Sequence, residues 1–91
     1  SLQTIQTAVD IEADALIVHH GIFWNGDPYP INGVKKRKIE LLINNNISLL
    51  AYHLPLDGNQ QIGNNWKAAL DLGWKDLSPC CMANGMPIGV A

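Results

Sequence analysis

Three histidines and one aspartate lie close to the ends of two short apolar segments. His19 and His20 follow the first segment, His53 ends the second, and Asp57 comes four residues later. In open α/β sheets, ligands bind just outside the carboxyl ends of the strands. If both segments are neighbouring strands, we expect these four side chains to converge on one edge of a sheet.

Imidazole and carboxylate groups together suit a divalent metal such as Zn, Fe, Mn, Co or Ni. Adjacent residues of an extended strand point to opposite faces, so His19 and His20 do not easily chelate one ion there. Where the chain turns through Gly21 they could serve two ions, with Asp57 bridging them. Two ions about 3.5–4 Å apart stabilise both the attacking and the leaving oxygen in hydrolysis. The simpler alternative is that these are hydrogen-bonded histidines at the rim of a core.

The spacing of apolar residues predicts helices that alternate with strands. Residues 15–18 are apolar throughout, which is typical of a parallel strand buried on both faces. The three asparagines at 44–46 favour the end of a helix, because asparagine tolerates the left-handed conformation. The predicted elements are helices at about 2–12, 34–45 and 64–72, and strands at 15–18 and 47–52.

This order predicts an α/β fold, with a layered parallel or mixed sheet and flanking helices. Residues 21–33 carry three glycines and two prolines and are expected to form a loop. Beyond Gly73 the periodicity fades, so no element is predicted for 79–91. Because two strands are too few for a stable sheet, the sequence indicates an incomplete domain.

The composition limits the classes of partner. The chain has 91 residues, enough for one domain at most. Hydrophobic residues make up 47% and charged residues only 15%, against a usual charged fraction of about 25%. We therefore expect part of the surface to be covered by another subunit or by further chain. The net charge of −2 argues against a general nucleic-acid or membrane-surface binder, and no apolar run reaches the length of a membrane span.

Three further features of the sequence are a pair of cysteines, a basic run and two aromatic residues. The adjacent Cys80 and Cys81 are expected to be reduced, buried thiols of a cytosolic protein, because a disulfide between neighbours is strained. The run at 35–38 holds four of the six basic residues, either as a solvated helical turn or as an anion site. Phe23 and Trp24 could wall a pocket for a planar substrate, or could anchor their loop or contact another subunit.

Two motifs resemble one known family. Residues 13–21, with the sequence ADALIVHHG and with Phe23 and Trp24 behind them, resemble the NIF-three-like family, whose bacterial members are called GTP cyclohydrolase type-two homologues. The second motif is YHLPLD at residues 52–57, with a Gly-Asn-Asn run beginning at Gly63. The motifs occur in the family's order, with a helix between them, and the resemblance covers nearly all of 1–78.

The resemblance implies an α/β domain assembled into a ring-shaped homo-oligomer, typically a homohexamer, with a dinuclear metal site facing an internal cavity. His19, His20 and Asp57 match the family's metal ligands, and His53 matches a histidine that is a ligand or a close neighbour. Residues 1–91 are then part of one NIF-three-like metal-binding domain that lacks its first strand and its C-terminal portion. The family's remaining ligands, a histidine and a glutamate four residues apart, would lie outside this chain.

From the residues and the resemblance together, we expect a cytoplasmic protein that binds two divalent metal ions and acts as a cyclohydrolase-like metal-dependent hydrolase. Its substrate would be a small molecule of the nucleotide or pterin kind, and His53 would be catalytic by moving a proton. The alternative is a non-enzymatic, metal-stabilised oligomeric scaffold or interaction protein. A third interpretation is anion or nucleic-acid binding through residues 35–38.

Overall fold

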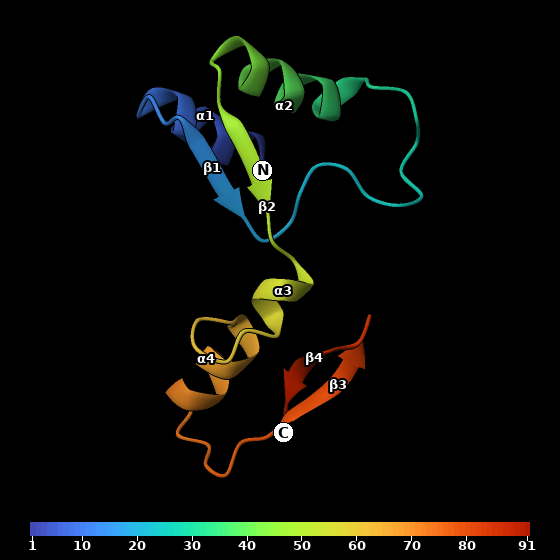
Figure 1. The fold of residues 1–91 in the computed structure, drawn as a ribbon. Helices are drawn as coiled ribbons and strands as arrows, with labels where there is room; N and C mark the ends of the chain where they lie inside the picture. Colours follow the sequence, from blue (N-terminus) through green and yellow to red (C-terminus); the bar gives the residue numbers. More distant parts are fainter. The chain divides into compact units, whose positions relative to one another are not determined.

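The computed structural model describes residues 1–91 and divides into two compact units, Ser1–Ala51 and Tyr52–Ala91. The chain has the mixed α/β fold that the sequence predicts, with one parallel and one antiparallel pair of strands (Figure 1). None of the helices is both long and apolar enough to span a bilayer. The first unit contains α1 (Leu2–Asp10), β1 (Ala15–Val18), α2 (Gly33–Asn44) and β2 (Ser48–Ala51), and the second contains α3 (Leu54–Asp57), α4 (Asn64–Asp71), β3 (Pro79–Ala83) and β4 (Met86–Val90).

The parallel pair in the first unit aligns the carboxyl ends of β1 and β2. Its register pairs Ala15 with Ser48 and Val18 with Ala51, so both strands end at the same level. Figure 1 shows the two arrows side by side and pointing the same way. This confirms the expected parallel arrangement and places the residues that follow the two strands at one edge of the sheet.

The core of the first unit lies between α1, α2 and one face of this sheet. Ser1 is the N-cap of α1, and its hydroxyl accepts a hydrogen bond of 3.1 Å from the backbone N–H of Thr4. From there the helix presents an apolar stripe at the helical repeat. The buried core consists of Ile5, Ala8, Leu42 and Ile47, with Leu16 and Leu49 of the strands among the half-buried side chains packed against it.

The other face of the sheet is open, which corrects the expectation that residues 15–18 form a strand buried on both faces. Exposure alternates along β1, and Ile17 is 70% exposed while its neighbour Leu16 is half-buried. Leu50, the partner of Ile17 in the register, is also exposed. The physical reason is that both covering helices of this unit pack on the Leu16 side, so nothing in the unit covers the second face.

The second unit contains elements that the sequence did not predict. α3 is a four-residue helix with Pro55 in its first turn, and β3 and β4 form an antiparallel hairpin within 79–91. α4 packs against β4, buries Trp66 and Ala69, and carries a hydrogen bond of 2.6 Å from the Asn65 amide to the carbonyl oxygen of Ile88. The hairpin and both helices therefore form one packed unit.

A glycine fixes the turn between α3 and α4. A Cβ added at Gly63 would overlap the backbone oxygens of Asn59 and Leu56, and backbone atoms cannot move aside as a flexible side chain can. We expect Gly63→Ala to lower the free energy of unfolding of the second unit by about 1–3 kcal/mol, the usual cost of overpacking. Urea denaturation followed by circular dichroism measures this loss. The exposed Gln60 of the same turn provides the control, and a Gly63→Ala variant as stable as Gln60→Ala would contradict this path of the turn.

Candidate metal centre

The two consecutive histidines lie together where the chain bends after β1. Their ring centroids are 4.5 Å apart and their planes are inclined by 49°. His19 is half-buried and His20 is exposed. In a straight strand these side chains would lie on opposite faces, so the bend is what brings both imidazoles to the same side.

Gly21 shapes this bend through its small size. A Cβ there would lie 3.3 Å from the Cβ of Ala51, the last residue of β2. Gly21 is not among the glycines with a positive φ angle, so the bend does not require a left-handed backbone there. Its contribution is a close approach between the segment after β1 and the end of β2.

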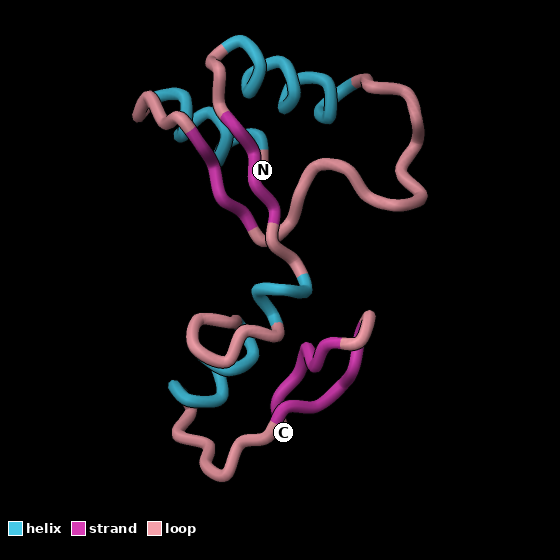
Figure 2. The backbone as a smooth tube through the Cα atoms, in the orientation of Figure 1, coloured by secondary structure: helices cyan, strands magenta, loops and turns pink.

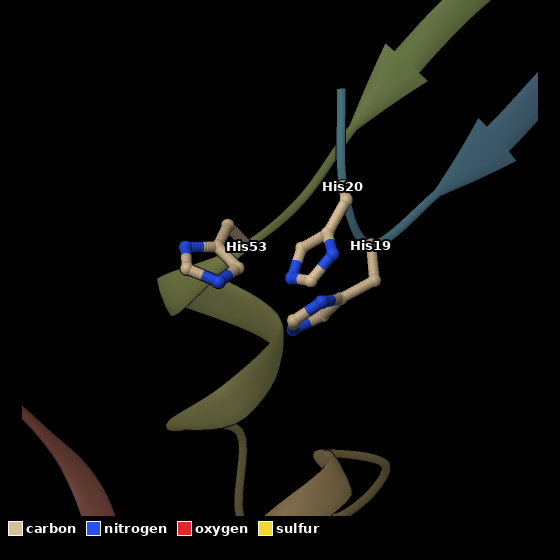
Figure 3. A group of neighbouring side chains, drawn as sticks. All are labelled: His19, His20 and His53. Atoms are coloured by element: carbon tan, nitrogen blue, oxygen red, sulfur yellow. The ribbon is translucent and has the colours of Figure 1, made fainter. Parts of the chain in front are cut away.

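The third histidine joins the pair through chain connectivity. His53 follows Ala51 by two residues, so its Cα lies within about 7 Å of the end of β2, whatever the course of the chain beyond it. Since Ala51 pairs with Val18, the residue before His19, all three histidines are held near one edge of the sheet. One ring nitrogen from each lies within 4.8 Å of the others (Figure 3).

The three imidazoles fit a divalent metal by their chemistry and spacing. Imidazole nitrogens bind Zn²⁺ at about 2.0–2.1 Å, and tetrahedral geometry then separates two such nitrogens by about 3.3 Å. Nitrogens that already lie within 4.8 Å of one another need only small side-chain rotations to reach this spacing. The histidine group could therefore bind a metal ion.

Asp57 lies at the end of α3, one turn after His53. The histidine group does not include it, and its Oδ1 accepts a hydrogen bond of 3.3 Å from the Asn64 amide. His53, which the sequence suggests as the catalytic residue, contributes a ring nitrogen to the same group as the two predicted ligands. The roles of these four residues remain predictions, but three of them share one location.

A comparison with protein-family models supports the resemblance. The model described as Duf34/NIF3 (NGG1p interacting factor 3) matches residues 1–90.

The chain belongs to the Duf34/NIF3 family.

Proteins with known sequences and structures agree with this membership. A protein from Chlamydia pneumoniae named GTP cyclohydrolase 1 type 2 homolog is 62% identical over 78 residues, which cover 86% of this chain and 31% of that protein. The structure of protein ybgI, described as of unknown function, matches with a TM-score of 0.79 and 40% identity, over 88% of this chain and 31% of its own. TTHA1606 from Thermus thermophilus matches with a TM-score of 0.78 and 47% identity, over 87% of this chain and 32% of its own. The chain thus spans about a third of the length of these Duf34/NIF3 relatives.

In this Duf34/NIF3 chain, a long loop joins β1 to α2, as the pink tube between them shows (Figure 2), and the histidine pair stands at its start. The ring of Trp24 meets that of His20 edge-on, with centroids 5.4 Å apart. Asp27 accepts hydrogen bonds from the backbone N–H of Trp24 at 3.3 Å and from the Lys35 ammonium at 3.1 Å, and Lys35 lies 5.1 Å from the centre of the Phe23 ring. This network links both aromatic residues to the histidine pair.

The same network lowers the pKa of Asp27. The hydrogen bond from Lys35 holds the pKa of Asp27 below its usual range, and the backbone N–H of Trp24 adds to this effect against the opposing effect of partial burial. Lys35, the first residue of the basic run, is thus already paired with a carboxylate. Apart from the charges of Asp27 and Lys35, the sequence carries no signal for this contact across eight residues.

Proposed function

We propose that this chain supplies part of a dinuclear divalent-metal site in a metal-dependent hydrolase of the GTP cyclohydrolase type 2 homologue kind. The observation that carries the proposal is the grouping of three histidine side chains at the aligned ends of two parallel strands. Perturbed or clustered ionisable side chains at such an edge are the usual starting point for an active-site hypothesis. The names of the relatives support the reaction class.

The chain's own residues have distinct roles in this proposal. His19, His20 and Asp57 hold the ions, and His53 either completes the ligand set or moves a proton at one of its ring nitrogens. When bound, a divalent metal supplies Lewis-acid catalysis and lowers the pKa of water toward neutrality. His53 is half-buried, so it is partly accessible to water, as a residue that transfers protons must be.

The loop after the histidines provides a place for the substrate. It borders a half-open hollow of about 550 Å³ whose lining includes Phe23, Trp24, Tyr29 and Lys35. Exposed aromatic rings bind planar groups by stacking, and a lysine favours an anionic neighbour. These features support a planar, small-molecule substrate such as a nucleotide or a pterin-like compound.

A test compares the metal content of variants at two carboxylates. We expect Asp57→Asn to weaken binding of Zn²⁺ or Mn²⁺ at least about tenfold, because it removes a charged oxygen ligand. Asp71→Asn is the matched control, since Asp71 is an exposed helix residue paired with Lys67. Elemental analysis after equilibrium dialysis measures the bound metal. Equal metal content in both variants would contradict the role of Asp57.

The alternative function is a non-enzymatic scaffold that the metal stabilises as an oligomer, with the homohexamer as the proposed assembly. The open sheet face with Ile17 and Leu50 favours contact with another subunit or with further chain. Turnover of GTP and a panel of phosphoesters by the metal-loaded protein separates the two functions. Hydrolysis that disappears with a chelator supports the enzyme, and full metal content without turnover supports the scaffold.

A further inference from the structure

The second unit contains a pair of thiols, separate from the metal centre. Cys80 and Cys81 of β3 are both free, and their sulfur atoms lie 3.4 Å apart. Cys80 is half-buried and Cys81 is exposed, which corrects the expectation of two buried thiols. The reason is that β3 belongs to a two-stranded hairpin, which cannot enclose both side chains of consecutive residues.

The backbone brings the two sulfurs to the same side of the hairpin. Consecutive strand residues normally point to opposite faces. Cys81 departs from this rule because its φ angle is +56°, in the left-handed region that non-glycine residues seldom adopt. The ladder pairs Cys80 with Gly89 and Met82 with Pro87, so Cys81 stands at a break between paired positions. Such an uncommon conformation is a reason to look for a function.

The opposite strand leaves room for these sulfurs. A Cβ added at Gly89 would lie 3.1 Å from the Cys80 sulfur and 3.3 Å from the Cys81 sulfur. Any larger residue at position 89 would therefore crowd both thiols. The missing side chain of Gly89 and the turned backbone of Cys81 together create an accessible dithiol.

We propose that Cys80 and Cys81 form a bidentate site for one soft, thiophilic centre of the trivalent-arsenic class. Their sulfur atoms lie 3.4 Å apart, close enough for both to bond to one such centre at about 2.3 Å. Zn²⁺ needs two more ligands, whereas a monosubstituted trivalent arsenical is satisfied by two sulfurs. This proposal does not depend on the proposed function.

The binding step is balanced without an oxidant. With an arsine oxide, two sulfur–arsenic bonds form and the arsenic–oxygen bond breaks. The oxygen leaves as water with the two thiol protons, and neither sulfur nor arsenic changes oxidation state. The competing reaction, a disulfide between adjacent cysteines, strains the peptide between them.

The protonation of Cys80 supports this chemistry. The hydrogen bond to Cys81, with partial burial and the neighbouring charge adding to it, raises the pKa of Cys80 above its ordinary value. Cys80 therefore favours its thiol form at neutral pH, which suits a reagent that takes up thiol protons as water.

The test titrates the reduced chain with phenylarsine oxide and counts the remaining thiols with a chromogenic disulfide. We expect one arsenical per chain to remove both thiols, and a small dithiol to restore them. Cys80→Ser and Cys81→Ser should each weaken binding about 100-fold or more, because one-point attachment loses the effective concentration of the second thiol. Gly89→Ala keeps both thiols and should weaken binding by less than either serine variant, since its Cβ only crowds the sulfurs.

The outcomes separate a dithiol site from two independent thiols. A 1:1 complex that needs both cysteines supports the proposal. Binding of two arsenicals per chain would overturn it, as would single variants that bind as tightly as the parent. Circular dichroism of the serine variants verifies that the hairpin is intact, and a Gly89→Ala variant with reduced affinity gives support that requires no loss of a thiol.

Discussion

Replacing both His19 and His20 by alanine is expected to lower the affinity for a divalent metal by at least about 100-fold. The two imidazoles lie side by side at the bend after β1, so the double variant removes two of the three grouped nitrogens. Changes to residues that merely support a metal ligand already cost about 10–100-fold in affinity, and the loss of two ligands costs more. Isothermal titration with Zn²⁺ measures the effect.

The fold should survive this double substitution, because neither side chain belongs to the core. Unchanged urea denaturation without metal is therefore the control. His53→Ala distinguishes the two roles proposed for this residue. If His53 is a ligand, the variant loses affinity for Zn²⁺. If it only moves a proton, the variant still binds Zn²⁺ but its turnover falls. Undiminished Zn²⁺ affinity in the double variant would refute the metal centre.

The first unit could be predicted from sequence because its signals are local and agree with one another. The apolar run 15–18 forms a strand with the predicted bounds, and the second strand lies within the predicted 47–52. Asn46 ends the second helix region with a φ angle of +52°, as the tolerance of asparagine for this conformation predicts. Strand–helix–strand order alone then favours parallel pairing, which the register confirms.

In the second unit, α4 lies within the helix predicted at 64–72. The hairpin could not be predicted, because its strands have weak signals. Pro79 is the first residue of β3 and Pro87 the second of β4, and in a sequence such prolines weaken the signal for a strand. The hairpin has two strands only, so both are edges, and proline is tolerated on edges. α3 was missed for a related reason, since Pro55 indicates a loop unless it occupies the first turn of a helix, as it does here.

The location of the candidate site was predictable, but its internal geometry was not. The rule that ligands bind at strand ends placed the histidines at one edge. It could not supply the bend that turns His19 and His20 to the same side, because that depends on the close approach of Gly21 to Ala51. The pairing of Asp27 with Lys35 depends in the same way on the path of a loop, which no periodic pattern specifies.

The core of the first unit gives the second large effect. Leu42 is only 6% exposed and packs with Ile5, Ala8 and Ile47, whereas the adjacent Ile43 is 71% exposed. We expect Leu42→Ala to lower the free energy of unfolding of the first unit by about 2–5 kcal/mol, since it removes buried methyl groups and leaves a cavity. Ile43→Ala is the matched control and should cost less than about 0.5 kcal/mol. Urea denaturation of both variants measures the difference.

If the histidines bind a metal ion as proposed, the stability of this core and metal binding are linked. Ile47 leads directly into β2, so loosening the core weakens the alignment of the strand ends that hold the histidines. An ion that binds only the folded unit stabilises it by about 2.7 kcal/mol at a hundred times its dissociation constant. Zn²⁺ should therefore restore much of the stability that Leu42→Ala loses, and should not do so when His19 and His20 are also replaced. Equal rescue with and without the two histidines would show that the metal acts elsewhere in the chain.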